Sequence, residues 1–314
     1  MNLLITGGAG FIGSNFILHI ARKYPDYTII NLDKLTYAAN HENLKLIEKK
    51  KNYFFIHGDI CDKKLIQKIC QTSSIDIIVH FAAESHVDRS IQSPETFIKT
   101  NIIGTHVLLQ VALKAKIRRF IQISTDEVYG SLGKKGHFTE KSTLKPSSPY
   151  SASKASADLL ALSYFYTYGF PVIITRSTNN YGPRQYIEKF IPVCIKNLLK
   201  NKKVPIYGHG ENIRDWIYVE DNCEAIDKVM HSGIIGEIYN IGANCEKNNK
   251  EVANLLIQKL EKPENFIQYI QDRPGHDFRY SLSTQKIHSE LHWKAKTSFN
   301  EGIQKTIEWY KNHF

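Results

Sequence analysis

Cysteine is scarce in this sequence, and long hydrophobic runs are missing. The 314 residues include five cysteines, none in a C-x-x-C pair or at the spacing of metal ligands, so we expect free thiols and no bound metal. No stretch is apolar over the length that crosses a bilayer, and the first residues lack the basic and apolar segments of a secretory signal. We therefore expect a cytoplasmic protein. The cysteines are Cys61, Cys70, Cys194, Cys223 and Cys245.

Acidic residues are also few, 31 against 41 lysines and arginines, which gives a formal net charge of +10. A protein that binds nucleic acid gathers its basic residues on one surface. Here they are spread along the chain, with short runs in "EKKKNY" and "KNLLKNKK". We therefore expect no nucleic-acid partner, and we expect the positive field to favour a small anionic ligand.

Short apolar runs alternate with helix-like segments in the first half of the chain. Hydrophobic residues make up 42% of the sequence, which is enough for a large core. The runs suit strands buried on both faces, and their alternation with helices is typical of a parallel sheet covered on both sides. We therefore predict an α/β fold with a doubly wound parallel sheet. Its predicted strands are "LLIT", "YTIINLD", "YFFIHGD", "IDIIVHFAA", "FIQIST", "PVIITRS" and "EIYNIG".

Helical spacing extends from Phe16 to Tyr24 and from Asn101 to Ala115. Three later segments, "NNYGPRQYIEKFIP", "VPIYGHGENIRDWIY" and "QDRPGHDFRY", are instead rich in Gly, Pro, Arg and aromatic residues. This composition predicts loops that shape a binding site.

A glycine-rich turn follows the first predicted strand. "LLITGGAGFIGSNF" satisfies G-x-G-x-x-G from Gly8, between a strand and a helix. Glycines there allow a pyrophosphate to approach the backbone, and the helix N-terminus stabilises its charge. Asp33 ends the second predicted strand, where an acid accepts hydrogen bonds from a ribose and repels a 2′-phosphate. The pattern predicts an NAD site in preference to an NADP site, and the alternative is a structural turn beside a surface acid.

Tyr150 and Lys154 lie four residues apart in "SSPYSASKASADLLALSYF". Ser148 can cap a helix there and Pro149 suits its first turn, so the two side chains share one helical face. A free tyrosine has a pKa of about 10, and a neighbouring ammonium lowers that value. Behind the glycine-rich turn, the pair indicates a tyrosine base held beside a nicotinamide.

Two adjacent acids, Asp126 and Glu127, follow the apolar run "FIQIST". Carboxylates at the mouth of a buried strand are costly unless something pairs or uses them. Ligands of α/β sheets bind at the carboxyl ends of the strands. The pair is therefore a candidate for acid and base chemistry, and the alternative is a loop with exposed acids.

Together these motifs resemble the extended short-chain dehydrogenase/reductases that act on nucleotide sugars, over essentially the whole chain. The resemblance narrows to the dTDP-glucose 4,6-dehydratase subgroup through "AAESHVDRS", "DKLTYAAN", "STDEVYG", "NNYGP", "RDWIYVED" and "DRPGHD". It implies a Rossmann domain over residues 1–178, with a return segment near 216–243. It also implies a smaller C-terminal α/β substrate-binding domain made of 179–215 and 244–314.

The resemblance implies dehydration of dTDP-glucose to dTDP-4-keto-6-deoxy-glucose. Oxidation at C4 acidifies the C5 proton, so that one carboxyl group removes this proton and another protonates the departing O6. The resemblance assigns Glu127 as the C5 base and Asp126, which must stay protonated, as the acid. It also assigns Tyr150 to take the O4 proton and Thr125 to a hydrogen bond with O4, with Lys154 holding the cofactor and the tyrosine together. NAD is expected to carry the hydride from C4 to C6.

The same resemblance assigns ligand contacts and a subunit interface. The expected NAD contacts are Gly7, Gly10, Phe11, Ile12, Gly13, Asp33, Lys34, Thr36, Asp59, Ile60, Phe81, Ala82, Ala83, Ser85, Thr100, Tyr150, Lys154 and Asn180. The expected substrate contacts are Ser85, Thr125, Asn179, Lys189, Phe190, Pro205, Tyr207, Arg214, Asn249, Arg273 and His276. Two helices, from Thr100 to Lys116 and from Tyr150 to Tyr168, are expected to pair two subunits as a homodimer.

Three alternatives stay open. A UDP-glucose 4,6-dehydratase fits the same motifs, and Arg184-Gln185, where many bacterial relatives have an aromatic residue or His, leaves the fine sugar preference undecided. An NAD-dependent epimerase or decarboxylase would share Tyr150 and Lys154 but would have no use for the two acids. A non-catalytic NAD-binding protein that senses redox state or binds RNA would show no turnover.

Overall fold

A parallel sheet, which we call the large sheet, forms the centre of the protein. The computed structural model describes residues 1–313, and within them seven strands make this sheet in the order β10-β6-β5-β4-β1-β2-β3. Each strand overlaps one of the seven predicted runs, which confirms the predicted α/β fold. The strands are β1 (Asn2–Thr6), β2 (Thr28–Asp33), β3 (Tyr53–His57), β4 (Ile77–His80), β5 (Arg119–Thr125), β6 (Val172–Ser177) and β10 (Ile238–Ile241).

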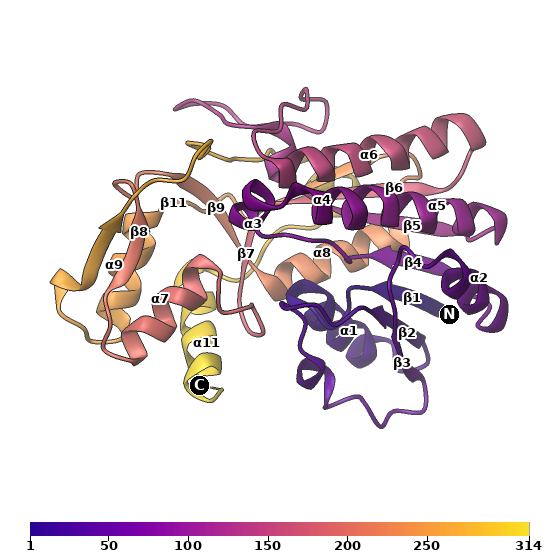
Figure 1. Ribbon diagram of the computed structural model, residues 1–314, viewed down its shortest axis with the longest axis horizontal. Helices are drawn as coiled ribbons and strands as arrows, with labels where there is room; N and C mark the ends of the chain where they lie inside the picture. Colours follow the sequence, from indigo (N-terminus) through magenta and orange to yellow (C-terminus); the bar gives the residue numbers. More distant parts are fainter. Residues whose placement is uncertain (314) are drawn as a thin grey trace.

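Helices cover both faces of the large sheet, as Figure 1 shows. Side chains alternate along a strand, so in β1 Leu3 and Ile5 pack into one buried cluster and Leu4 packs into the other. The first cluster contains residues of α1 (Phe11–Lys23), α8 (Val219–Ser232) and α10 (Gln285–Leu291). The second contains residues of α2 (Lys63–Thr72), α5 (Thr105–Lys114) and α6 (Pro149–Tyr168). This layering is what makes the strands hydrophobic on both faces.

A smaller core lies beyond the carboxyl ends of the large-sheet strands (Figure 1). Its helices are α7 (Phe190–Leu199), α9 (Asn249–Lys259) and α11 (Phe299–Lys311). Its strands are β7 (Asn179–Tyr181), β9 (Ile213–Tyr218) and β11 (Glu246–Asn248) in one sheet, and β8 (Val204–Tyr207) with β12 (Ile267–Ile270) in another. The remaining short helices are η1 (His41–Leu44), α3 (Val87–Gln92), α4 (Pro94–Phe97), η2 (Ile98–Gly104), η3 (Asp126–Tyr129) and η4 (Glu264–Phe266). The predicted division into two domains stays a prediction, and its last residue, 314, lies outside the described residues.

Several expected boundaries were wrong. Two of the three segments predicted as loops contain regular structure. The first holds β7 and the start of α7, and the second holds β8 and β9, because pairing partners far along the chain hold these strands extended. The third, 271–280, contains no helix or strand, as predicted. The first helix begins at Phe11 and not at Phe16, directly after the glycine-rich turn. The helix expected from Asn101 is a π-helix, η2, that passes into α5 at Thr105.

Three further observations bear on the expected class of protein. No helix within residues 1–313 is long and apolar enough to cross a membrane. The same residues contain no group of three or more His, Cys, Asp or Glu side chains that could hold a metal ion. All five cysteines are free thiols.

A buried carboxylate, Asp227 on α8, joins α8 to α1. Only 1% of its side chain is exposed. Lys23 Nζ, His19 Nε2 and His231 Nδ1 lie 2.6, 2.9 and 2.8 Å from its oxygens, and the hydroxyl of Tyr24 donates to it at 3.1 Å. Burial by itself would raise the pKa of Asp227, but hydrogen bonds from these partners outweigh burial and lower the pKa well below its usual range. The same contact raises the pKa of His231.

We expect Asp227→Asn to lower the free energy of unfolding by about 2 kcal/mol, because the charged acceptor that Lys23, His19 and His231 share is lost from a buried position. A raised histidine pKa stabilises the fold below the unfolded value of about 6.5 and ceases to do so as the pH rises through the folded value. The difference in melting temperature between wild type and variant should therefore shrink from about pH 6 to about pH 9. It should also shrink in strong acid, because a lowered carboxyl pKa stabilises only above the unfolded value of about 3.9.

Thermal unfolding followed by circular dichroism measures this difference. Glu224→Gln, on the same helix, is the control, because its partner Lys296 is largely exposed. A difference that grew toward alkaline pH would contradict this account.

Candidate active site

Two cavities meet at the carboxyl ends of the large-sheet strands. One, of ≈ 240 Å³, follows β1, β2, β3 and β4, and we call it the cofactor cavity. The other, of ≈ 340 Å³, lies between α3 and the smaller core, and we call it the substrate cavity. Ser85, Gln185 and Lys189 line both, so the two are continuous. The strand order reverses between β1 and β4, which is where open α/β sheets bind ligands.

The glycine-rich turn forms the floor of the cofactor cavity. Gly7 has a φ of +71°, and a Cβ there would lie 2.5 Å from the backbone nitrogen of Ala82 on the next strand. A Cβ at Gly13 would lie 2.3 Å from the carbonyl oxygen of Gly7, so α1 could not approach the turn. These residues leave room for a pyrophosphate at the N-terminus of α1 and therefore fit a dinucleotide.

Asp33 lies at the end of β2 and lines the cofactor cavity. Its carboxylate oxygens accept hydrogen bonds from the backbone N–H groups of Ala9, at 2.9 Å, and Leu35, at 2.8 Å. Burial raises the pKa of Asp33, and these two hydrogen bonds oppose the rise. Each oxygen can accept a further hydrogen bond, so the carboxylate is held in place and can still bind a ribose diol.

The structure brings nearly all the expected NAD contacts to one cavity. All of them except Asn180 line the cofactor cavity, whereas Asn180 lines the substrate cavity. The side chain of Asn180 donates to the carbonyl of Thr178 at 2.9 Å. Sequence reasoning missed Glu84 and Tyr186, which also line the cofactor cavity. Both lie inside segments quoted in the sequence analysis, "AAESHVDRS" and "NNYGPRQYIEKFIP". Their position within these motifs could have indicated that they line the cavity.

The acid pair lies where β5 passes into the short helix η3. Thr125 caps η3, accepting from the backbone N–H of Glu127 at 3.3 Å, and its hydroxyl donates to Asp126 Oδ1 at 3.2 Å. Asp126 is only 2% exposed, and its Oδ2 has no hydrogen-bond partner among the described residues. Burial and the charge of Glu127 raise the pKa of Asp126 well above its usual value, which favours the protonated form of this carboxyl group.

Glu127 differs from Asp126 in its surroundings, because its side chain lines the substrate cavity. Burial raises the pKa of Glu127, and the nearby charges of Arg214 and Lys189 oppose that rise. Thr125 and Asp126 line neither cavity, so they lie behind Glu127 in the wall. The two adjacent carboxyl groups thus have different chemical environments, since one is shielded from both cavities and the other faces the substrate cavity and nearby cations.

Tyr150 and Lys154 lie on α6, which begins with the predicted cap. The side chains of Ser148 and Ser151 form a capping box, and both Tyr150 and Lys154 line the cofactor cavity. Burial lowers the pKa of Lys154 to about 8, and its ammonium donates to the carbonyl of Ile123 at 2.7 Å. Burial, with the charge of Glu127, raises the pKa of Tyr150 above its ordinary value. The expectation of a lowered tyrosine pKa was wrong for the protein alone, because burial and the charge of Glu127 decide the direction of the shift.

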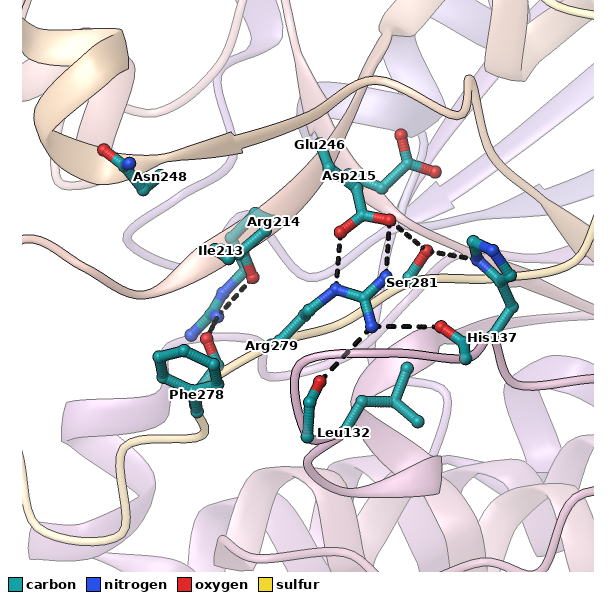
Figure 2. A network of polar contacts seen from close by, with 12 residues as sticks. Leu132, His137, Ile213, Arg214, Asp215, Glu246, Asn248, Phe278, Arg279 and Ser281 are labelled. Carbon is teal, nitrogen blue, oxygen red and sulfur yellow. Dashed lines mark hydrogen bonds and ion pairs between the residues drawn. The ribbon is translucent and has the colours of Figure 1, made fainter.

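Arg214 on β9 is fixed in the wall of the substrate cavity. Its Nη1 donates to the carbonyls of Ile213 and Phe278 at 2.8 and 3.3 Å (Figure 2). Its Nη2 donates to the carbonyl of Asp277 at 3.0 Å. The guanidinium also lies over the ring of Tyr280, at 4.3 Å. Two of its five N–H groups remain for a ligand, and its low exposure means that it is ordered before any ligand binds.

A second arginine, Arg279, secures the segment that carries these contacts. Its Nε and Nη2 bind the two carboxylate oxygens of Glu246 at 2.5 and 2.7 Å, and Ser281 donates to the same carboxylate at 2.8 Å. Its Nη1 donates to the carbonyls of Gly133 and Gly136. Figure 2 shows Arg279 between Glu246 and the loop near Leu132. The arginine thereby ties β11, the 131–137 loop and the 277–281 segment together.

The expected substrate contacts gather at the substrate cavity. All of them except Thr125 line it. Lys189 donates to the carbonyl of Ser85 at 2.8 Å, so it reaches from the smaller core to the large-sheet side. Sequence reasoning missed His86, Asp88, Ser147, Gln185, Glu188, Trp216, Asp277 and Tyr280. These residues also lie inside segments quoted in the sequence analysis, and the fold shows that they face the cavity.

Comparisons with known proteins agree with this geometry. A family profile described as GDP-mannose 4,6 dehydratase matches residues 4–306. The dTDP-glucose 4,6-dehydratase of Haemophilus influenzae is 48% identical over 331 residues, covering 99% of this chain and 98% of that protein. The crystal structure of the Streptomyces venezuelae dTDP-glucose 4,6-dehydratase with NAD bound is 46% identical with a TM-score of 0.96, covering 99% of this chain and 97% of that chain.

A UDP-glucose 4-epimerase of Thermotoga maritima also shares the fold. Its TM-score is 0.93 at 30% identity, with 100% of this chain and 99% of that chain covered. The fold therefore does not distinguish dehydratase from epimerase, and the residues of the site must do so.

The fold and the two joined cavities define an NAD-dependent enzyme of the extended short-chain dehydrogenase/reductase class. Within this class the chain belongs to the dTDP-glucose 4,6-dehydratase family, as its identity over nearly the full length of such relatives shows. The resemblance deduced from the sequence motifs is confirmed.

We expect Asp33→Asn to weaken NAD binding roughly 10- to 100-fold, because a hydrogen bond to a charged group is lost on the ribose. NADP binding should change little or improve, because the carboxylate that repels the 2′-phosphate is gone. Isothermal titration of cofactor-stripped protein measures both constants. Asp26→Asn, an exposed acid in the preceding turn, is the control. An unchanged ratio of the two affinities would exclude Asp33 as the ribose ligand.

Proposed function

We propose that the enzyme converts dTDP-glucose to dTDP-4-keto-6-deoxy-glucose by oxidation at C4, loss of water across C5 and C6, and reduction at C6. The observation that carries this proposal is the pair of unlike carboxyl groups: Glu127 lines the substrate cavity, Asp126 is buried next to it in the chain, and Tyr150 lines the adjoining cofactor cavity. An epimerase needs no such pair. The names of the relatives, nearly 50% identical to this chain, support thymidine as the nucleoside.

The first step requires removal of a proton from the C4 hydroxyl. When bound, NAD⁺ takes up the hydride from C4, returns it to C6 and adds a positive charge near Tyr150. A positive charge stabilises the phenolate and so opposes the rise in pKa that burial causes in the protein alone. We assign Tyr150 as the proton acceptor. The ammonium of Lys154 lies on the same face of α6 as Tyr150. Thr125 directly precedes the acid pair in the chain, and we assign it to orient the C4 hydroxyl of the substrate.

The second step requires a base for C5 and an acid for O6. A ketone at C4 acidifies the C5 proton, and Glu127, which faces the substrate cavity, is placed to take it. Asp126, whose raised pKa keeps its proton at neutral pH, supplies that proton to the departing hydroxyl. When C6 receives the hydride, C5 must regain a proton, which Glu127, protonated in the previous step, is placed to return. The proton that Tyr150 took from O4 replaces, through solvent, the proton that Asp126 gave up, so atoms and electrons balance with water as the only other product.

We expect Glu127→Gln and Asp126→Asn, made separately, each to reduce turnover on the order of 10²- to 10⁴-fold. Either variant should still oxidise C4, because Tyr150 and Lys154 remain, and should therefore accumulate enzyme-bound reduced nicotinamide. Glu127→Gln should also abolish exchange of the C5 hydrogen with solvent, whereas Asp126→Asn should permit some exchange. Tyr150→Phe should block oxidation and give no reduced nicotinamide.

Stopped-flow absorbance of the nicotinamide and the mass of the product are the measurements. Glu42→Gln, at a largely exposed glutamate, is the control for substitution of an acid by its amide. If both acid variants turned over at the wild-type rate, the assignment of the two carboxyl groups would be wrong. A product with the mass of the substrate would point to an epimerase, and turnover of UDP-glucose in place of dTDP-glucose would point to the uridine carrier.

We also propose that two subunits pair through α5, η2 and α6, which lie side by side on one face of the large sheet (Figure 1). Leu159 and Tyr166, seven residues apart and hence on one face of α6, are 58% and 76% exposed. Ile103 on η2 is 48% exposed. Exposed apolar side chains on adjacent helices are typical of a surface covered by a partner, and a second copy presents a matching surface.

We expect Leu159→Asp to shift the protein from dimer to monomer, because a charge in a four-helix interface is desolvated without a partner. Light scattering at micromolar concentration measures the mass. The control is Leu46→Asp, at an exposed leucine away from these helices. A wild-type monomer at that concentration would refute the proposed homodimer. A cytoplasmic location and the lack of a nucleic-acid partner remain part of the proposal.

A further inference from the structure

Asp88 lies on the first turn of α3 and lines the substrate cavity from the large-sheet side. Across the cavity, Arg273 places Nε 2.6 Å from Asp88 Oδ1 and donates from Nη2 to Oδ2 at 3.0 Å. The hydroxyl of Tyr207 on β8 donates to the same Oδ2 at 3.3 Å. A single carboxylate therefore holds one arginine and one tyrosine of the smaller core.

The contacts also orient the two partners relative to each other. The guanidinium carbon of Arg273 lies 5.2 Å from the centre of the Tyr207 ring, and the ring of His276 meets Tyr207 edge-on at 6.1 Å. Within residues 1–313, Arg273 Nη1 makes no hydrogen bond to protein, so one amino group of the guanidinium stays available to an anion. Asp88 thus occupies one side of the arginine and leaves the other for a ligand.

Neighbouring residues of the same turn make parallel connections. Arg89 Nη2 lies 3.2 Å from Glu188 Oε2, and the carbonyl of Ser85 accepts from Lys189 at 2.8 Å. These contacts, with those of Asp88, run from one side of the substrate cavity to the other. Asp88 differs from the rest because both of its partners are themselves candidate contacts for the nucleotide.

We propose that Asp88 is a positioning residue for the nucleoside diphosphate end of the substrate, acting through Arg273 and Tyr207. An arginine has many rotamers, and a guanidinium already held in place loses less entropy when a phosphate binds. The opposing effect is that the carboxylate cancels part of the arginine charge. We expect the ordering of Arg273 and Tyr207 to outweigh this loss of charge. Asp88 prevents the arginine side chain from turning into solvent, and the N–H groups of Nη1 stay available to a phosphate.

This inference rests on the proposed function, since it takes a nucleoside diphosphate as the ligand. The first experiment is equilibrium binding of thymidine diphosphate to NAD-loaded enzyme, which involves no turnover. Asp88→Asn and Asp88→Ala should each weaken binding roughly three- to tenfold. In steady-state kinetics with dTDP-glucose they should raise KM by a similar factor and leave kcat nearly unchanged, because Glu127, Asp126 and Tyr150 are not touched.

Asp76→Asn is a matched control. Asp76 also pairs with an arginine, Arg118, at 2.6 Å, and its side chain is 26% exposed against 29% for Asp88, but it lies outside both cavities. The control should change neither KM nor the binding constant. If Asp88 had only a structural role, its variants would show a lower melting temperature and a lower kcat. A raised KM with an unchanged kcat would not be seen.

The sign of the effect decides the outcome. If Asp88 instead competed with the phosphates for Arg273, the Asp88 variants would bind thymidine diphosphate more tightly, and the inference would be overturned. Unchanged binding would overturn it as well. Failure of the proposed function would give a different result. The wild-type enzyme would bind thymidine diphosphate and the Asp88 variants would bind it more weakly, but no dehydrated product would form from dTDP-glucose.

Discussion

Burial of two adjacent carboxyl groups at the end of β5 is the constraint on which the site depends. A buried charge is costly, and the protein meets that cost differently for each group. Asp126 lines neither cavity, and burial and the charge of its neighbour raise its pKa, which favours its protonated form. Glu127 faces the substrate cavity, where Arg214 and Lys189 supply positive charge. The same local sequence therefore yields an acid and a carboxylate side by side, which is what an elimination across two carbons requires.

Polar contacts between the large-sheet side and the smaller core give the substrate cavity its form. Lys189 with Ser85, Asp88 with Arg273, and Arg89 with Glu188 all cross from one to the other. Other buried oxygens in the cavity wall have no protein partner among the described residues, including Asn179 Oδ1, Gln185 Oε1 and Glu188 Oε1. Buried acceptors without donors suit a ligand rich in hydroxyl groups, as a hexose is. The cavity thus presents cations for phosphates and acceptors for a sugar.

Local chemistry explains which features the sequence predicts well. Each large-sheet strand is buried on both faces, so its hydrophobic run is visible without knowledge of its partners. The glycine-rich turn, Asp33 and the capped helix of Tyr150 and Lys154 each depend on residues close in the chain. β8 and β9 were read as loops because their extended form depends on pairing with β12, β7 and β11, which lie far away in sequence. The pKa of Tyr150 was misjudged for the same reason, since the burial and the charge of Glu127 that raise it come from other elements.

The sequence by itself determined the parallel sheet, the dinucleotide turn, the preference for NAD and the presence of an acid pair beside a tyrosine and lysine. These follow from the period of hydrophobic residues and from spacings of a few residues. Only the tertiary structure decided that Asp126 is shielded while Glu127 faces ligand, that Arg214 is fixed by carbonyls of a distant segment, and that Asp88 binds Arg273. These features depend on burial, on electrostatic fields and on contacts between residues far apart in the chain. They arise when the large sheet and the smaller core pack together, and no local pattern encodes them.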